Sequence, residues 1–167
     1  MEIAMRLAVS VLFLLFAQPV AAQDAVPDAA PLFAAGLWDV RDEPASLAGL
    51  RGRALIVNFW ARWCGPCRAE IPEFVAAHRG LKGKDPLVVG IALEEHGQTV
   101  REFAKVYEMD YLLLLARDRG QPLMRALGNQ AAALPYTLVI DRAGRIVSSK
   151  QGVMSRSELE RAIASVQ

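Results

Sequence analysis

The sequence has few residues of the kinds that hold metals or cross-link small proteins. Its 167 residues include two cysteines and two histidines. Two cysteines can form one disulfide at most, which excludes a small domain held together by several disulfides. A structural zinc site needs four ligands, so all four of these side chains would have to meet at one ion. His78 lies three helical turns beyond Cys67, and this spacing argues against such a site.

The sequence also lacks an excess of charge and a long apolar run. Its 19 basic and 18 acidic side chains leave a net charge of +1, and no basic stripe typical of a nucleic-acid-binding protein is present. The apolar run near the N-terminus, from Leu7 to Phe16, is interrupted by Ser10 and is about half as long as the ~20 residues that a membrane-spanning helix needs. The length suits one ordinary domain.

The first 22 residues have the order of a secretory signal: a short segment with a basic residue, an apolar run, and then a proline among small residues. Val20 and Ala22 are the small residues that a signal peptidase would read. We therefore expect residues 1–22 to be removed and the mature chain to begin near Gln23, with an uncleaved inner-membrane anchor as the alternative. Residues 23–31 are rich in Ala, Asp and Pro and predict a flexible leader.

Residues 32–167 predict one folded domain in which strands and helices alternate. Apolar runs of strand length predict buried strands, and capping boxes at Thr99 and Ser155 predict the starts of two helices. The order of elements predicts an α/β domain of three layers, whose sheet is parallel at first and antiparallel at the end. The expected strands are 37–40, 54–61, 87–93, 111–115, 138–141 and 145–149, and the expected helices are 65–79, 99–108, 122–127 and 155–166.

Two cysteines at the junction of a buried strand and a helix carry the clearest chemical signal. Cys64 and Cys67 are separated by Gly65 and Pro66, which places them one helical turn apart, about 5 Å between Cα atoms and close enough for a disulfide. At the helix N-terminus, Cys64 meets free N–H groups that favour a thiolate, and such positions lower a thiol pKa from ~8.5 to ~3.5–7.5. A purely structural bridge is the alternative, but so small a loop constrains the unfolded chain little.

Several features resemble the thioredoxin-like, exported thiol–disulfide oxidoreductases of the TlpA and ResA type. The resemblance covers the chain from about Leu32 to the C-terminus. It implies a thioredoxin-like fold, a three-layer α/β/α arrangement around a central mixed β-sheet. The stretches that carry it are Trp-Cys-Gly-Pro-Cys-Arg at 63–68, Asn-Phe-Trp-Ala at 58–61, Glu-Ile-Pro at 70–72 and Leu-Pro-Tyr-Thr-Leu-Val-Ile-Asp at 134–141.

The resemblance also implies two further site residues. Pro135 matches the cis-proline that lies beside the two sulfurs in the family and leaves the preceding backbone free to pair with a substrate strand. Asn58 stands where thioredoxin has a buried aspartate, so that proton acceptor is missing. In the exported relatives a glutamate near the end of the next strand faces the cysteines, and here that position is Glu94. Glu95 is the rival, since a shift of one residue reverses the face of a strand. The remaining alternative is that both are solvated carboxylates at the end of the strand.

The activity that the resemblance implies is that of a periplasmic enzyme, a thiol–disulfide oxidoreductase of the protein-disulfide reductase type. Cys64 would attack a client disulfide and Cys67 would resolve the mixed disulfide, without a cofactor. The expected partners are disulfide-containing exported proteins and a membrane thiol electron donor, with no nucleic acid, and the protein would act as a monomer. The alternative is a copper-handling assembly factor that uses the two thiols as soft ligands.

Overall fold

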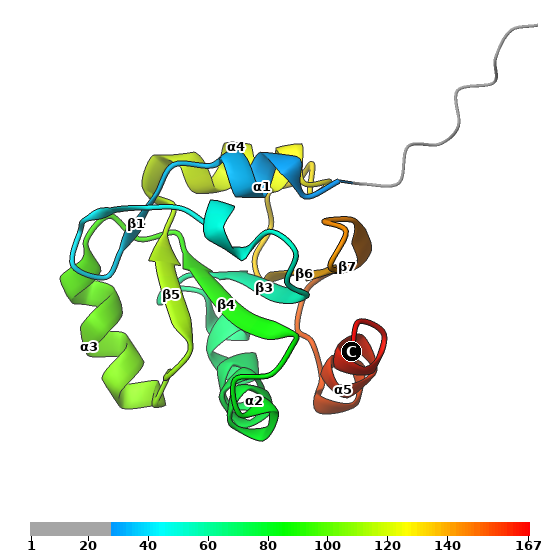
Figure 1. Cartoon of the computed structure of the whole chain (residues 1–167). Coiled ribbons are helices and arrows are strands. Elements are labelled where there is room, and N and C mark those ends of the chain that lie inside the picture. Colours follow the sequence, from blue (N-terminus) through cyan, green and yellow to red (C-terminus); the bar gives the residue numbers. More distant parts are fainter. Residues whose placement is uncertain (1–27) are drawn as a thin grey trace, which may run out of the picture.

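A seven-stranded mixed β-sheet lies between two layers of helices (Figure 1). The computed structural model describes residues 28–167. The sheet has the strand order β2-β1-β5-β4-β3-β6-β7. Its strands are β1 (Leu37–Asp39), β2 (Pro44–Ala45), β3 (Leu55–Trp60), β4 (Leu87–Ala92), β5 (Leu112–Leu115), β6 (Tyr136–Ile140) and β7 (Ile146–Gln151).

The directions of the strands confirm the predicted mixed sheet. β3, β4 and β5 run parallel to one another, while β6 pairs antiparallel with β3 and β7 antiparallel with β6. β1 extends the sheet beyond β5 in the antiparallel direction, and the short strand β2 pairs with β1. The structure is therefore the expected three-layer α/β/α fold, with β2 as an additional strand that the sequence pattern did not predict.

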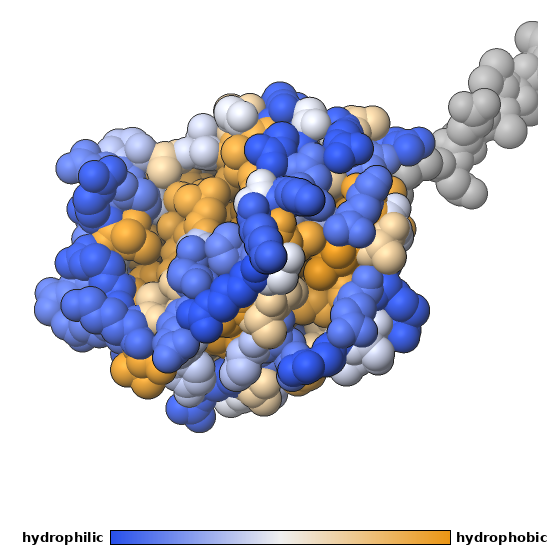
Figure 2. All heavy atoms as spheres, turned by 60° about the horizontal axis from the view of Figure 1, so that its bottom comes forward, coloured by the Kyte–Doolittle hydropathy of each residue, from blue (hydrophilic) through white to orange (hydrophobic). Residues whose placement is uncertain are grey.

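Helices cover both faces of the sheet. α1 (Ala30–Ala34) and α4 (Gly120–Ala126) lie on one face, and α2 (Gly65–Leu81), α3 (Gly97–Tyr107) and α5 (Arg156–Ala164) lie on the other (Figure 1). Each face has its own apolar core. From the side of the three helices, strips of apolar side chains are visible between ridges of polar ones (Figure 2).

The central strand β3 is buried along its whole length, which explains its continuous apolar run. Its side chains alternate between the two faces, so Ile56 and Trp60 belong to the core beneath α2, α3 and α5. Asn58 lies between them in the strand and shares their face. It is fully buried, and this places one polar side chain in the layer between the sheet and α2.

Of the two predicted capping boxes, one is wrong and one is confirmed. The predicted capping box at Thr99 is wrong, because α3 begins at Gly97 and its N-cap, His96, makes no side-chain capping bond. The Asp42 carboxylate accepts a hydrogen bond from Gly97 N–H at 2.9 Å instead, so a residue distant in sequence satisfies the first turn. The capping box at Ser155 is confirmed at the start of α5.

The folded domain also begins earlier than Leu32, the first residue expected after the leader. Ala29 is fully buried and α1 starts at Ala30, so the part of the leader from residue 28 onward packs on the domain. The predicted signal peptide, residues 1–22, and the rest of the leader lie outside the described residues. Within residues 28–167, no helix is long and apolar enough to cross a membrane.

Candidate active site

A disulfide joins Cys64 and Cys67 at the start of α2, shortly after the end of β3. The two Cα atoms are 5.3 Å apart, as the spacing predicts. Cys64 is the N-cap of the helix and has an extended backbone, while Cys67 lies in the first turn. The Cys67 N–H donates a hydrogen bond to Cys64 Sγ at 3.2 Å. A thiolate at Cys64 would therefore face a backbone donor and the positive end of the helix dipole.

The two sulfur-bearing residues differ in access. Cys64 is 6% exposed, whereas Cys67 is fully buried in the core beneath α2. The residue before the disulfide, Trp63, is 65% exposed. An incoming disulfide can reach the first cysteine from solvent and must displace protein atoms to reach the second. This difference fits the predicted roles, with Cys64 as nucleophile and Cys67 as resolving residue.

A shallow groove adjoins Cys64. One side is formed by the active-site turn and the other by the segment between α4 and β6. No side chain that lines the groove is charged, so it suits an uncharged, extended segment of a partner. Its lining consists of Trp63, Cys64, Gly65, Pro66, Leu93, Gln121, Ala132, Ala133 and Leu134.

The peptide bond between Leu134 and Pro135 is cis, as the family resemblance implies. Leu134 lines the groove at Cys64, and Pro135 is buried directly before β6. The carbonyl of Pro135 accepts a hydrogen bond from Gly152 N–H at 2.8 Å. Within residues 28–167, neither backbone polar group of Leu134 has a partner. These two groups are therefore free to pair with an extended chain in the groove.

Of the two rival glutamates after β4, Glu94 is the one that is buried, and Glu95 is exposed. The Glu94 carboxylate accepts a hydrogen bond from the backbone N–H of Arg62 at 2.9 Å and lies 3.3 Å from Arg62 Nε. Both of its oxygens are thus engaged by a residue two positions before Cys64. Through Arg62, Glu94 fixes the turn that leads into the active-site helix.

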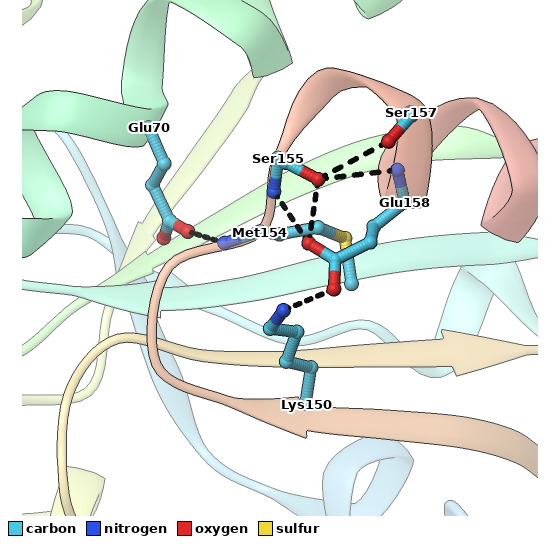
Figure 3. A network of polar contacts seen from close by, with 6 residues as sticks. All are labelled: Glu70, Lys150, Met154, Ser155, Ser157 and Glu158. Atoms are coloured by element: carbon cyan, nitrogen blue, oxygen red, sulfur yellow. Dashed lines mark hydrogen bonds and ion pairs between the residues drawn. The ribbon is translucent and has the colours of Figure 1, made fainter.

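A second buried acid, Glu70, is a site residue that the sequence analysis did not single out. It lies three positions after Cys67 on α2, on the same face of the helix, and is 1% exposed. One carboxylate oxygen accepts from Asn58 Nδ2 at 2.7 Å and the other from the backbone N–H of Met154 at 2.8 Å. Figure 3 shows this carboxylate reaching from α2 to the connection between β7 and α5.

The environment of Glu70 changes its proton affinity. Burial raises the pKa of the Glu70 carboxyl to about 7, and the hydrogen bonds from Met154 N–H and Asn58 act in the opposite direction. Asn58 Nδ2 also donates to Thr137 Oγ1 at 3.1 Å on the neighbouring strand. At neutral pH the site thus holds an acid that can take up or release a proton one helical turn from Cys67.

The signal for Glu70 was present in the sequence as a spacing. A glutamate three residues after a cysteine in a helix lies on the same face of the helix as that cysteine. This face of α2 must be buried, because it covers the apolar strand β3. A charged residue is normally assigned to the solvent side of a helix. The sequence does not reveal that the Glu70 carboxylate meets two buried hydrogen-bond donors. Only the packing of α2 against Asn58 and the position of Met154 N–H show this.

The comparisons with known proteins agree with this geometry. The family model described as Redoxin matches residues 21–163. The chain is 27% identical over 142 residues to the thiol-disulfide oxidoreductase ResA of Geobacillus kaustophilus, covering 85% of this chain and 78% of that protein. It is 25% identical over 122 residues to ResA of Bacillus thuringiensis subsp. konkukian, covering 73% of this chain and 68% of that protein.

A solved structure is similar over almost its whole length. A thiol:disulfide interchange protein of the thioredoxin family from Chlorobium tepidum TLS is 30% identical, with a TM-score of 0.67, and the match covers 86% of this chain and 99% of that chain. The chain belongs to the Redoxin family and is a thiol–disulfide oxidoreductase of the TlpA/ResA type.

Proposed function

We propose that this protein reduces disulfides of exported client proteins in the bacterial periplasm through Cys64 and Cys67. The observation that carries the proposal is the position of Cys64 Sγ, which accepts the Cys67 N–H at a helix N-terminus and lies beside an uncharged groove. A thiolate is stabilised there and remains open to a partner on one side.

The reaction proceeds in two exchange steps. The Cys64 thiolate attacks one sulfur of the client disulfide, a Cys64–client bond forms, and the other client sulfur leaves as a thiolate that takes up a proton from water. Cys67 then loses its proton and attacks Cys64 Sγ, which releases the second client sulfur as a thiolate. The client gains two electrons, and the protein ends with the Cys64–Cys67 bridge seen in the structure.

The proton lost by Cys67 needs an acceptor in a buried site. Burial raises the pKa of Glu70 to about 7 and the residue lies one helical turn away, so it fits this role. The Glu94 carboxylate is instead paired with the Arg62 guanidinium, two positions before Cys64. We assign Glu94 a second part in the same site. It holds the turn at Arg62 and thereby the backbone that precedes Cys64.

The client segment would lie as an extended chain along the groove. The free N–H and C=O of Leu134, next to Pro135, would pair with the backbone of the client, and the apolar lining would contact its side chains. A membrane thiol donor would then reduce the Cys64–Cys67 bridge, since an oxidising compartment would otherwise leave the protein oxidised.

Export is proposed from the order of residues 1–22, which is that of a secretory signal. A structure with the same fold, 21% identical, is described as a secreted disulfide oxidoreductase of Mycobacterium tuberculosis.

The reduction potential of the Cys64–Cys67 couple tests the direction of electron flow. Equilibration of the protein with glutathione or dithiothreitol buffers gives this potential. A reductant should have a value close to that of thioredoxin, about −270 mV, because its oxidised form must be the more stable one. A value near about −120 mV, that of the strong oxidant DsbA, would contradict the proposed reducing role.

A further inference from the structure

The segment between α4 and β6 forms one wall of the groove at Cys64, and a hydrogen bond joins the two ends of this segment. The Tyr136 hydroxyl donates a hydrogen bond to the carbonyl of Leu127 at 2.7 Å, which joins the end of α4 to the start of β6. Ala132, Ala133 and Leu134, within this segment, line the groove. The conformation of these three residues therefore decides the shape of the surface that a client meets.

One buried side chain, that of Asn129, organises the segment from inside. Asn129 is 3% exposed. Its Nδ2 donates to the carbonyl of Ala133 at 2.8 Å, and its Oδ1 accepts from the N–H of Ala133 at 3.3 Å. Its own backbone N–H donates to the carbonyl of Met124 at the end of α4, and its carbonyl accepts from Ala132 N–H, both at 2.9 Å. The side chain thus holds both polar groups of one wall residue.

The conformation that Asn129 holds is one that the chain would not adopt freely. Ala132 has a φ of +49°, in the left-handed region, which is unfavourable for a residue with a Cβ. Such a residue persists where its neighbours over-determine the backbone. Here the bond from Ala132 N–H to the Asn129 carbonyl and the two bonds to Ala133 fix the chain on both sides of it.

Neighbouring residues of the wall differ in whether their backbone N–H and C=O groups are already hydrogen-bonded. Both polar groups of Ala133 are occupied by Asn129, so this residue offers the groove only its apolar surface. The next residue, Leu134, keeps both of its backbone groups free. A client strand therefore finds one pairing position, at Leu134, preceded by a position at which pairing is blocked. That pattern fixes the register of the client chain relative to Cys64.

We propose that Asn129 is a positioning residue for the client segment: it builds the groove wall in advance and sets the register in which the client's disulfide meets Cys64. The inference rests on the proposed reduction of client disulfides. Because the wall is formed before binding, a peptide does not have to order the segment when it docks. A small disulfide without a peptide chain does not use the wall and gains nothing from it.

The test compares two substrates in steady-state kinetics, with dithiothreitol as the electron donor that restores the Cys64–Cys67 dithiol and with the uncatalysed rate subtracted. The substrates are a disulfide-bonded peptide with uncharged flanking residues, and hydroxyethyl disulfide. Asn129→Ala should lower kcat/KM for the peptide about tenfold, mostly through KM, because the loosened wall must be ordered at each binding event. The loss with hydroxyethyl disulfide should be much smaller. The control is Gln130→Ala in the same segment, since Gln130 is exposed and its side chain bonds only the carbonyl of Arg125.

Equal losses with both substrates, or no loss with the peptide, would overturn the proposal. A readout on the unmodified protein covers the case in which Asn129→Ala fails to fold. Amide hydrogen exchange should be slow at Ala133 and fast at Leu134, and equal rates at the two amides would contradict the assigned wall. If the unmodified protein reduces hydroxyethyl disulfide but never the peptide, the proposed reduction of client disulfides is wrong. The amide hydrogen exchange rates at Ala133 and Leu134 then still test the assigned structure of the wall.

Discussion

The buried carboxyl group of Glu70 is the group of the site whose proton affinity the fold changes most clearly. It is buried beside α2, its two oxygens each accept one N–H, and burial still raises its pKa to about 7. Neither donor carries a full charge, and these two bonds, together with the smaller effect of the Lys150 charge, do not offset the loss of water. The group is therefore poised between its two protonation states at neutral pH, where thiol chemistry also takes place.

The raised pKa of Glu70 predicts that the unfolding free energy depends on pH. The folded pKa of Glu70 lies above the ordinary value of 4.5, so folding is favoured below pH 4.5, and that contribution is lost as the pH rises to about 7. Across this window the oxidised protein should lose roughly 3 kcal/mol of unfolding free energy more than Glu70→Gln, at about 1.4 kcal/mol for each pKa unit. Urea unfolding at a series of pH values measures the difference.

Parallel pH curves for the parent and Glu70→Gln would show that the carboxyl titrates normally. The same variant has a kinetic consequence. Without the negative charge beside it, the thiol pair should titrate at a lower apparent pKa and exchange at a different rate. Glu94→Gln is the informative comparison: it should alter the turn at Arg62 and leave this titration almost unchanged, and the opposite ranking would restore Glu94 as the proton acceptor.

At the level of residues, the sequence was most informative where spacing alone determines geometry. The interval between Cys64 and Cys67 predicts a closable disulfide and the helix start predicts the more exposed sulfur, and both are found. Tertiary contacts could not be predicted in this way. The bond from Met154 N–H to Glu70 joins residues 84 positions apart, and the hold of Arg62 on Glu94 depends on two strand ends meeting.

Among the elements, α5 has a defined structural role near the active site. Its N-cap, Ser155, accepts from Glu158 N–H, and the Glu158 carboxylate returns to Ser155 N–H and also pairs with Lys150 on β7 (Figure 3). The bond with Lys150, and then those with Ser155, lower the pKa of Glu158 to about 2. The cap lies directly after Met154, so the start of α5 and the donor to Glu70 are held together.

Removal of the cap should therefore weaken the domain. Ser155→Ala leaves Glu158 N–H without its side-chain acceptor and should lower the unfolding free energy by about 1 kcal/mol. Denaturant unfolding at constant pH measures this change. Ser157→Ala is the matched control on the same helix, since the Ser157 hydroxyl contacts only the Ser155 hydroxyl, and it should shift stability by less than half as much. Equal losses would mean that the cap contributes nothing specific.

Sequence patterns predicted most of the elements well, and the errors have identifiable causes. All six predicted strands and α2, α4 and α5 lie within a few residues of their predicted positions, because apolar runs and helix caps leave clear signals. α3 starts early because Asp42, remote in sequence, replaces the local cap. β2 is two residues long, too short for any periodicity to indicate it.

For the molecule as a whole, the site is assembled from four separate parts of the chain. The N-terminus of α2 carries the cysteines, the end of β4 supplies Glu94, the segment before β6 supplies the groove wall with Leu134, and the connection to α5 holds Glu70. These parts meet at one end of the sheet because β3, β4 and β6 are neighbours in it. The order of elements predicted only the three-layer mixed sheet, and the resemblance to the TlpA/ResA type implied places for Pro135 and Glu94 near the cysteines. The groove and the position of Glu70 depend on tertiary contacts that neither indicates.

The most direct test of the central claim is to trap the mixed disulfide. In the reduced Cys67→Ala variant, Cys64 can attack a disulfide-bonded peptide but nothing can resolve the product, so a covalent complex should accumulate and be cleaved by dithiothreitol. The Cys64→Ala variant retains only the buried Cys67 and should form little or no complex. Mass spectrometry of the non-reduced samples identifies the linked residue. A complex that forms through Cys67, or in neither variant, would contradict the account.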